Sequence, residues 1–451
     1  MQEKQEFENF LLRPLNSGEI KFKKNESSNS EESTQSNNEN NDYLNPIFNL
    51  NNNNMNNYNQ NFLKSDLYDR LNEEEIQDTI LKNKNTSNFN NTNAKNTNNN
   101  LNPVQNRNLE RNENPYNNTN SIIAKTCLIN DENKSYLNAI LQCLINIKSL
   151  KEYFTSKKNV DYLEKKRKEF RLSFATSRVF YHSYIQKDKF YALQNYSIIL
   201  GEYNPIYKSN KSRSPNECLN YILEKLSEEL NTIIPSNDRL EYNDSDKEDV
   251  INSSIIYFKN INESIISSIF NWFEFKEFHC SECGDITYEF KNFNSFQLDT
   301  MGYYNKLKRN NINIIDCINF DFKKTIDKYC KICRKRGKFS IFSSIYKLPQ
   351  IFIFFLDIGE DINFSLDEEI NLKRFCQLNN VPSSRYELIG IISKKAKCNT
   401  KYVSFTKSFE DQKWYYFDEK VEIYEKNQVI FDNNNNDLFI PCILFYKLME
   451  K

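Results

Sequence analysis

The chain has 451 residues and a formal net charge of −1, because 60 Lys and Arg side chains are balanced by 61 Asp and Glu. This balance excludes the basic footprint of a typical nucleic-acid-binding domain, so we expect no direct nucleic-acid partner. No apolar run reaches the about 20 residues needed to span a bilayer, and the N-terminus lacks the features of a secretory signal, so we expect no membrane partner. The 11 cysteines are then expected to be thiols, metal ligands or catalysts in a cytoplasmic or nuclear protein.

The first 120 residues are dominated by asparagine, in runs such as NNNNMNN and NNTNAKNTNNN, and show almost no aliphatic periodicity. Such a segment cannot bury enough apolar surface to offset the entropy that a chain loses on folding. We therefore expect residues 1–120 to be disordered. Aliphatic and aromatic residues become frequent from Ser121 onward, which predicts one large folded domain over residues 121–450.

The folded part opens with CLINDENKSYLNAILQCL (127–144), where a polar loop changes abruptly into a helical pattern. The apolar residues of this pattern fall on one face, at Leu137, Ile140, Leu141 and Leu144. Ser135 stands at the entrance to the helix. An enzyme can place a nucleophile at such a position, but a serine is equally typical of a helix cap with no reaction to perform.

A second helix is predicted over SPNECLNYILEKLSEEL (214–230). Ser214 can cap it, Pro215 suits its first turn, and Glu217 is placed to close a capping box. Its apolar stripe indicates a core helix, with Leu219, Ile222, Leu223, Leu226 and Leu230 facing inward.

Two CxxC pairs follow, with 46 residues between them. Four thiolates in two such pairs match the closed tetrahedral site that structural zinc prefers, which predicts one zinc ion bound by Cys280, Cys283, Cys330 and Cys333. The alternative is four free thiols with an accidental spacing. Residues 288–298 alternate between apolar and polar types as a strand does, so we expect a zinc-clipped β-extension over about residues 275–340.

The C-terminal third is rich in strand-like runs. FSIFSSIYKLPQIFIFFLDI predicts two strands, and YELIGIIS, KYVSFTK, KWYYFDE and LFIPCILFYKL predict four more. Helices followed by a run of strands indicate an antiparallel sheet packed on the earlier helices, which is an α+β fold.

Taken in chain order, these motifs resemble those of the ubiquitin-specific protease family of cysteine deubiquitinases. NDENKSYLNAILQ is similar to the family's opening box, RSPNECLNYIL to its second helix, and the CxxC pairs to its zinc-bearing fingers. YKLPQIFIFFL is similar to a family strand, and YELIGIIS, KYVSF and KWYYFDE to the closing box. The resemblance covers residues 121–448. It implies a papain-like fold with a helical thumb, a β palm and zinc-ribbon fingers, which grips ubiquitin and leads its C-terminal tail into a narrow channel.

Carried over position by position, the resemblance places the family's nucleophilic Cys at Ser135 and its general-base His at Lys401. The acid that orients the base falls on Asp418, and the oxyanion-stabilising Asn falls on Asn130. The family's Leu-Gly ahead of the nucleophile is replaced by the acidic pair Asp131-Glu132. Two of the four functional positions therefore keep their residue type, and the two that make and break bonds do not.

This double replacement indicates an inactive protein. A cysteine at a helix N-terminus beside a histidine ionises near neutral pH, whereas a serine hydroxyl keeps its proton. The chain's two histidines, His182 and His279, do not match the base position. Loss of nucleophile or base costs a protease roughly 10⁶-fold in rate. We therefore expect a ubiquitin carboxyl-terminal hydrolase-like pseudoenzyme that binds ubiquitin or a ubiquitinated protein.

Two alternatives are kept open. Inactive members of the family are similar to scaffolds in RNA-processing complexes, so the domain could bind other proteins without affinity for ubiquitin. An atypical deubiquitinase could instead use Lys401 as the base for Ser135. The lysine pKa would then have to fall from about 10.4 to about 7–8, which an ionised Asp418 beside it would oppose. Cys398 is not expected to replace the nucleophile, because it also lacks a histidine partner.

Overall fold

The structure, a computed structural model, describes residues 124–450 except 131, 237, 310, 360–361, 378–382, 397, 399, 419 and 425–438. The described residues belong to one compact unit, Asn112–Lys451. The region 1–120 that the sequence predicts to be disordered lies outside the described residues. None of the helices in the described part of the chain combines the length and the apolarity needed to cross a bilayer.

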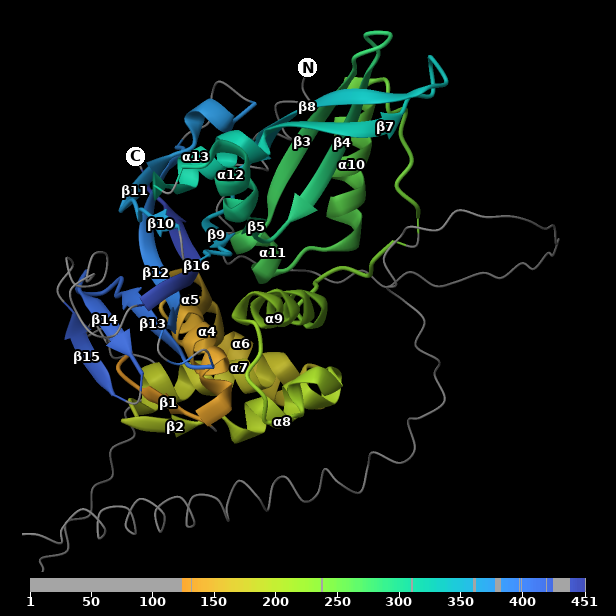
Figure 1. Cartoon of the computed structure of the whole chain (residues 1–451). Coiled ribbons are helices and arrows are strands. Elements are labelled where there is room, and N and C mark those ends of the chain that lie inside the picture. Colours follow the sequence, from red (N-terminus) through yellow and green to blue (C-terminus); the bar gives the residue numbers. More distant parts are fainter. Residues whose placement is uncertain are drawn as a thin grey trace, which may run out of the picture. The chain divides into compact units, whose positions relative to one another are not determined.

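Helices form the first half of the domain, which we call the thumb (Figure 1). A short parallel pair of strands, β1 (Cys127–Ile129) and β2 (Phe190–Ala192), lies at its edge. The thumb helices are α4 (Ser135–Ile145), α5 (Lys148–Thr155), α6 (Lys157–Lys165), α7 (Arg171–Tyr181), α8 (Gln194–Tyr203) and α9 (Pro215–Glu229). The predicted apolar stripes of α4 and α9 are buried, and α4 is covered on almost every side.

The second half contains an eight-stranded sheet, which we call the palm. Its strand order is β15-β14-β13-β12-β16-β9-β5, with β11 added beside β12, and all pairs are antiparallel except β5 with β9. The strands are β5 (Phe296–Gln297), β9 (Ile351–Phe355), β11 (Glu369–Asn371), β12 (Arg385–Lys395), β13 (Tyr402–Lys407), β14 (Trp414–Phe417), β15 (Val421–Tyr424) and β16 (Phe439–Leu448).

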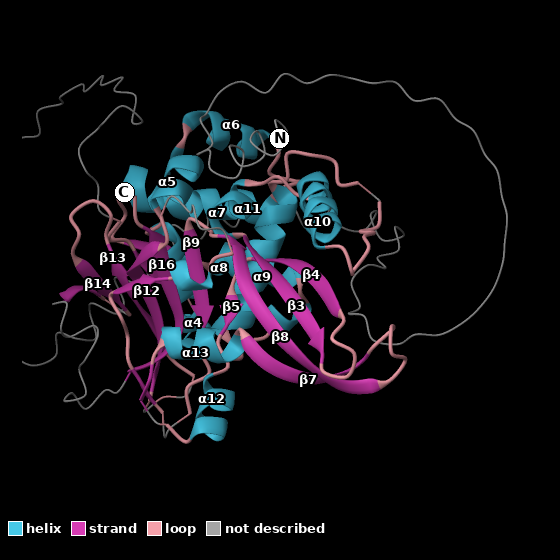
Figure 2. Cartoon of the chain, turned by 90° about the horizontal axis from the view of Figure 1, so that it is seen from above, coloured by secondary structure: helices cyan, strands magenta, loops and turns pink. Residues whose placement is uncertain are grey.

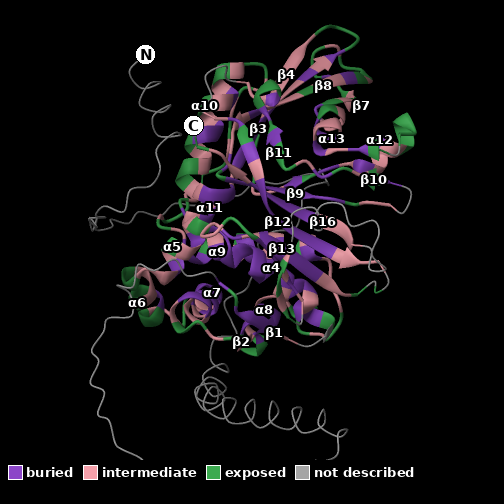
Figure 3. Ribbon diagram, turned by 90° about the vertical axis from the view of Figure 1, so that its left-hand side faces the viewer, coloured by how far each residue is buried: buried purple, intermediate pink, exposed green. Residues whose placement is uncertain are grey.

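The run IFIFF in β9 shows why the palm has no polar face at its centre. Ile351, Ile353 and Phe355 pack into the core shared with the thumb helices. Phe352 and Phe354 point to the opposite face, into a second core that also contains residues of α12 (Thr300–Leu307) and α13 (Ile314–Asp321). A strand that is covered on both faces needs a continuous apolar sequence. Figure 3 shows this buried centre in β9, β12 and β16 and in α4.

A separate four-stranded antiparallel sheet, which we call the fingers, extends from the palm (Figures 1 and 2). Its order is β4-β3-β8-β7, built from β3 (Trp272–Cys280), β4 (Ile286–Phe293), β7 (Lys323–Tyr329) and β8 (Arg336–Lys347). Helix α10 (Lys247–Ile261) packs on β4, and its Phe258 ring stacks on the rings of Phe273 in β3 and Phe290 in β4. The short helix α11 (Ile265–Phe270) joins α10 to β3. A further parallel pair is formed by β6 (Asn311–Ile312) and β10 (Asn363–Phe364).

The predicted α+β fold with thumb, palm and fingers is confirmed, but the sequence missed some of its local structure. The strand expected over residues 288–298 is interrupted between Phe293 and Phe296, where the chain leaves the fingers and joins the palm as β5. Ser214 precedes α9 as predicted, but its side chain makes no capping hydrogen bond. Pro215 at the first helical position therefore starts the helix without the expected capping box.

Candidate active site and metal centre

Helix α4 begins at Ser135 and presents this residue to the palm. The residue at the N-cap position is Lys134, and no side chain caps the helix. The Ser135 hydroxyl instead accepts a hydrogen bond from the Tyr402 backbone N–H at 3.0 Å and donates one to the Thr400 carbonyl at 3.4 Å. Ser135 is therefore the first residue of the helix, as the sequence predicts, but its hydroxyl caps none of the N–H groups of α4. Its side chain joins the thumb to the backbone on both sides of Lys401.

Lys401 and Asp418 come together as the sequence predicts. The Lys401 ammonium lies 3.2 Å from Asp418 Oδ1, and Lys395, at the end of β12, donates to Oδ2 from 2.9 Å. The Tyr416 hydroxyl also donates to Oδ2, at 3.3 Å. Burial alone would raise the pKa of Asp418, but the hydrogen bond and charge of Lys395, with the charge of Lys401, hold that pKa below its ordinary value. Asp418 is therefore an ionised carboxylate between two ammonium groups at neutral pH.

Both histidines have partners away from this site. His182 Nδ1 lies 2.6 Å from Asp188 in the thumb, and its ring stacks on Tyr191. His279 Nε2 lies 3.3 Å from Glu277 in the fingers. Because the chain has only these two histidines, no imidazole is available to Ser135.

Asn130 lies just before the α4 entrance, and its amide forms hydrogen bonds with the Ser197 hydroxyl of α8 at 3.1 and 3.4 Å. In this conformation the amide is engaged with the thumb. Asp131 and the Glu132 side chain, the predicted acidic departures from the family pattern, lie outside the described residues. The oxyanion role of Asn130 stays a prediction.

A pocket with a volume of about 30 Å³ is lined by Ser135 and Asp418. A volume of this size holds one or two water molecules. Three buried atoms of its lining residues, Asn138 Oδ1, Gln142 Oε1 and Ser404 Oγ, have no hydrogen-bond partner among the described protein atoms. Buried polar atoms of this kind normally bind ordered water, which we expect here.

Sequence reasoning missed several residues of this site. Lys395 and Ser212 carry no motif, and their roles depend on hydrogen bonds to residues 23 and 188 positions away. Cys127 also lines the pocket and donates to the Asp418 carbonyl at 3.5 Å. Of the site residues that were not predicted, Gln142 belongs to a recognisable motif, because it is the last residue of the opening box NDENKSYLNAILQ.

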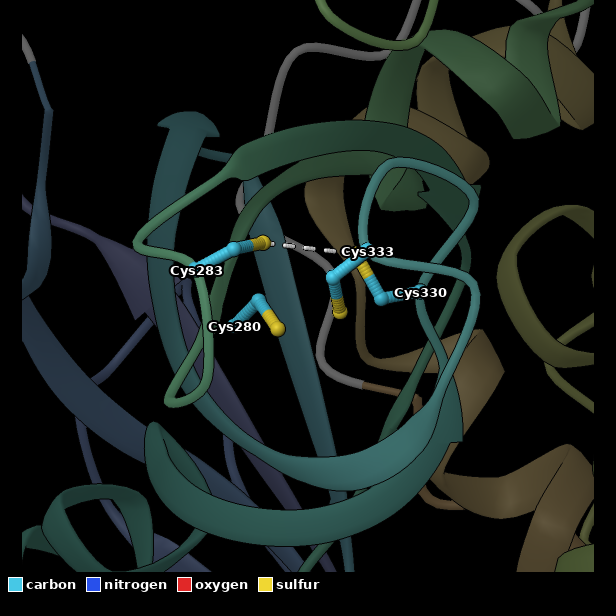
Figure 4. A group of neighbouring side chains, drawn as sticks. All are labelled: Cys280, Cys283, Cys330 and Cys333. Atoms are coloured by element: carbon cyan, nitrogen blue, oxygen red, sulfur yellow. Dashed lines mark hydrogen bonds between the residues drawn. The ribbon is translucent and has the colours of Figure 1, made fainter.

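The four predicted metal ligands meet at the far end of the fingers (Figure 4). The sulfur atoms of Cys280, Cys283, Cys330 and Cys333 all lie within 4.8 Å of one another, and those of Cys283 and Cys330 are 3.7 Å apart. A tetrahedral ion with metal–sulfur bonds of about 2.3 Å requires sulfur atoms roughly 3.8 Å apart. The residues present therefore fit a single four-coordinate metal ion.

The two CxxC turns that carry these cysteines have the same backbone shape. Cys280 N–H bonds to the Asp285 carbonyl at 2.9 Å, and Cys330 N–H bonds to the Lys335 carbonyl at 2.8 Å. The residue after the second cysteine of each pair has a positive φ, which is 74° at Gly284 and 55° at Arg334. This conformation suits glycine and is strained for arginine, so the second turn is held by its surroundings.

Comparison with known proteins agrees with this geometry. The family model described as "Ubiquitin carboxyl-terminal hydrolase" matches residues 126–446. The chain belongs to the ubiquitin carboxyl-terminal hydrolase family. Its thumb, palm and fingers are the parts of that family's ubiquitin-specific protease fold.

Solved structures of similar fold come from the deubiquitinating module of SAGA. A chain of the Ubp8/Sgf11/Sus1/Sgf73 module bound to ubiquitin aldehyde matches with a TM-score of 0.55 and 16% identity, over 74% of this chain and 71% of that one. A chain of a Ubp8 variant of this module bound to monoubiquitin matches with a TM-score of 0.52 and 17% identity, over 73% and 70%. At these identities the likeness concerns the fold.

Proposed function

We propose that this domain is a catalytically inactive ubiquitin carboxyl-terminal hydrolase-like protein that binds ubiquitin or a ubiquitinated protein. The observation that carries the proposal is the bonding of the Ser135 hydroxyl. Its proton points to the Thr400 carbonyl, which cannot act as a base, and its lone pair accepts the Tyr402 N–H. A hydroxyl held in this way lacks the proton acceptor that every serine nucleophile needs.

The residue at the base position gives further support. A general base must be unprotonated, and an ammonium 3.2 Å from an ionised carboxylate is stabilised in its charged form. Lys395 shares the same carboxylate, so Asp418 neutralises two cations rather than orienting a base. The Ser135–Lys401 dyad is therefore disfavoured, because the lysine would have to lose its proton beside a retained negative charge.

Binding is the function that survives this loss. The solved structures of similar fold hold ubiquitin aldehyde or monoubiquitin, and the described residues of this chain include a thumb, a palm and fingers. A domain that has this fold but no catalytic activity can bind a protein partner without hydrolysing it. The alternative, a scaffold with no ubiquitin affinity, has the same frame and is separated from the first proposal by experiment.

We further propose that the metal of the fingers is zinc. Four thiolates with no open coordination position match a structural zinc site, which holds a fold together and does no chemistry. Cys280, Cys283, Cys330 and Cys333 would hold the ion and join the β3–β4 turn to the β7–β8 turn. This role suits the fingers, where the cluster core otherwise contains little more than Phe278 and Phe339.

Titration of the purified full chain with ubiquitin tests the binding proposal. Isothermal calorimetry should show saturable binding with one ubiquitin per chain, and an unrelated protein of the same size should give no signal. A flat titration with correctly folded protein would remove ubiquitin as the partner and leave the scaffold function.

A further inference from the structure

The turn that joins β7 to β8 carries a local excess of positive charge that the charge balance of the whole chain conceals. Residues 323–338, KKTIDKYCKICRKRGK, contain eight Lys and Arg residues and one acidic residue, Asp327. We call residues 323–338 the basic hairpin. It forms one edge and the far end of the fingers (Figures 1 and 2). The expectation of no nucleic-acid partner rests on net charge, which does not register a cluster of this kind.

Most of these cations are not neutralised within the described part of the chain. Lys324 pairs with Asp321 at 2.6 Å, and Lys331 pairs with Asp244 at 2.8 Å. The Lys328 ammonium lies 4.2 Å from the centre of an aromatic ring of β3. No described carboxylate forms an ion pair with the other five, which are all exposed: Lys323, Arg334, Lys335, Arg336 and Lys338. Like charges at neighbouring positions repel one another, so an anionic partner that neutralises them gains free energy.

The acidic groups near the basic hairpin do not pair with these five cations. Asp327 stands opposite Lys338 in the β7–β8 ladder, and Glu282 belongs to the other CxxC turn. Neither carboxylate forms an ion pair with another described residue. The four cysteines of the metal centre add negative charge as thiolates, but two of them are buried, whereas the five cations reach solvent. The exposed surface of the hairpin is therefore cationic.

An aromatic side chain lies among these cations. Tyr329 is 56% exposed and stands directly opposite Arg336 in the β7–β8 ladder. Among the described residues, no ring or cation packs on the Tyr329 ring. Proteins bind single-stranded nucleic acid with this combination, because the cations neutralise phosphates while the ring stacks on an unpaired base. An acidic peptide would use the cations alone and offer no matching group to the ring.

We propose that the basic hairpin is a binding site for single-stranded nucleic acid. Its exposed Lys and Arg side chains contact phosphates, and Tyr329 stacks on a base. The site needs no particular sequence, since every base has a face on which a ring can stack. It lies at the end of the fingers that also carries the four cysteines (Figure 4), so it goes beyond the binding function proposed for the domain.

Fluorescence anisotropy measures this binding with the full chain and a labelled oligothymidylate of about 12 nucleotides. The wild-type chain should bind at low salt. The logarithm of the association constant should then fall against the logarithm of salt concentration with a slope of about −3, as expected when about four phosphates of a single strand are neutralised. Absence of binding at low salt overturns the proposal.

Charge reversal tests where the nucleic acid binds. The triple variant Lys335→Glu, Arg336→Glu, Lys338→Glu should weaken binding at least about tenfold. The matched control makes the same change in net charge at three exposed positions of α6, and should weaken binding less than about threefold: Lys157→Glu, Lys158→Glu and Lys165→Glu. Equal losses in the two triple variants would show that net charge alone attracts the oligonucleotide, and would overturn the assignment.

Two single positions keep the test decisive if the triple variant does not fold. Arg334→Gly relieves a backbone with a φ of 55°, so it should melt no lower than wild type and yet bind about threefold more weakly. Tyr329→Ala should weaken binding at least about fivefold, and Tyr329→Phe should restore it. Unchanged binding by Tyr329→Ala, or equal competition by polyglutamate of similar length, would identify an acidic protein as the partner and overturn the proposal.

Discussion

At the scale of single residues, the hydrogen-bond partners of Ser135 decide what it can do. A serine at the start of a buried helix could be a nucleophile, a cap or a bridge. The sequence alone leaves the first two open, and the third needs Thr400 and Tyr402, which lie more than 260 positions away. Ser135, Lys401 and Asp418, the residues that the resemblance assigns to one site, lie near one another in the structure. The resemblance could not show where the hydroxyl proton points.

Asp418 provides a test of the charge arrangement. Asp418→Asn should lower the free energy of unfolding by about 1–3 kcal/mol at neutral pH, because it leaves two half-buried ammonium groups without their carboxylate. Chemical denaturation of both proteins measures the difference. Asp161→Asn, at an exposed position of α6, is the control and should change stability little.

The same pair predicts a pH dependence. The pKa of Asp418 is lower in the folded protein than in the unfolded chain, so its stabilisation is complete above the ordinary carboxylate range near about 4. The stability advantage of wild type over Asp418→Asn should shrink as the pH falls through that range and vanish below the lowered pKa. A difference that stays constant down to the acid transition would show that the ion pairs do not cause it.

At the scale of elements, helix starts show the limit of sequence signals. Ser214 has the sequence context of a capping box but makes no capping bond, whereas Asp246 accepts from the N–H groups of Glu248 and Asp249 at the start of α10. A cap depends on the side-chain rotamer and the entering chain, and neither is visible in the residue pattern. The apolar periodicity of α4 and α9 predicted the helices themselves, because it reflects the burial that forms them.

These two starts give a paired prediction. Asp246→Ala should lower the free energy of unfolding by about 1 kcal/mol through the loss of its cap, and Ser214→Ala should change it by less than about 0.5 kcal/mol. Thermal or chemical denaturation of the two variants beside wild type provides the comparison. A larger loss for Ser214→Ala than for Asp246→Ala would contradict the observed capping.

The fingers give the metal prediction. Purified protein should contain one zinc ion per chain by elemental analysis, and Cys333→Ser should reduce that content and expose the β3–β4 and β7–β8 turns to protease. Cys398→Ser is the matched control, because Cys398 is exposed and lies outside the cluster. Folded wild-type protein without metal, or an unchanged zinc content in Cys333→Ser, would refute the assignment.

At the scale of the whole molecule, the order of motifs along the chain predicted the fold. Each motif marks a place where the family's structure requires a residue type, such as the paired cysteines or the strand that is apolar on both faces. Elements without such a requirement could not be predicted from a motif. They include α12, α13 and the return of the chain from the fingers into β5. The contacts of Ser135 and Ser212 with the Thr400 carbonyl were equally hidden, since they depend on how three distant segments meet.

The central claim is that this domain does not hydrolyse the bond at the C-terminus of ubiquitin. The most direct measurement is incubation of the full wild-type chain with a fluorogenic C-terminal amide of ubiquitin, beside Ser135→Ala. The account predicts that both proteins release fluorophore no faster than buffer does. Turnover by the wild-type chain that disappears in Ser135→Ala would contradict it.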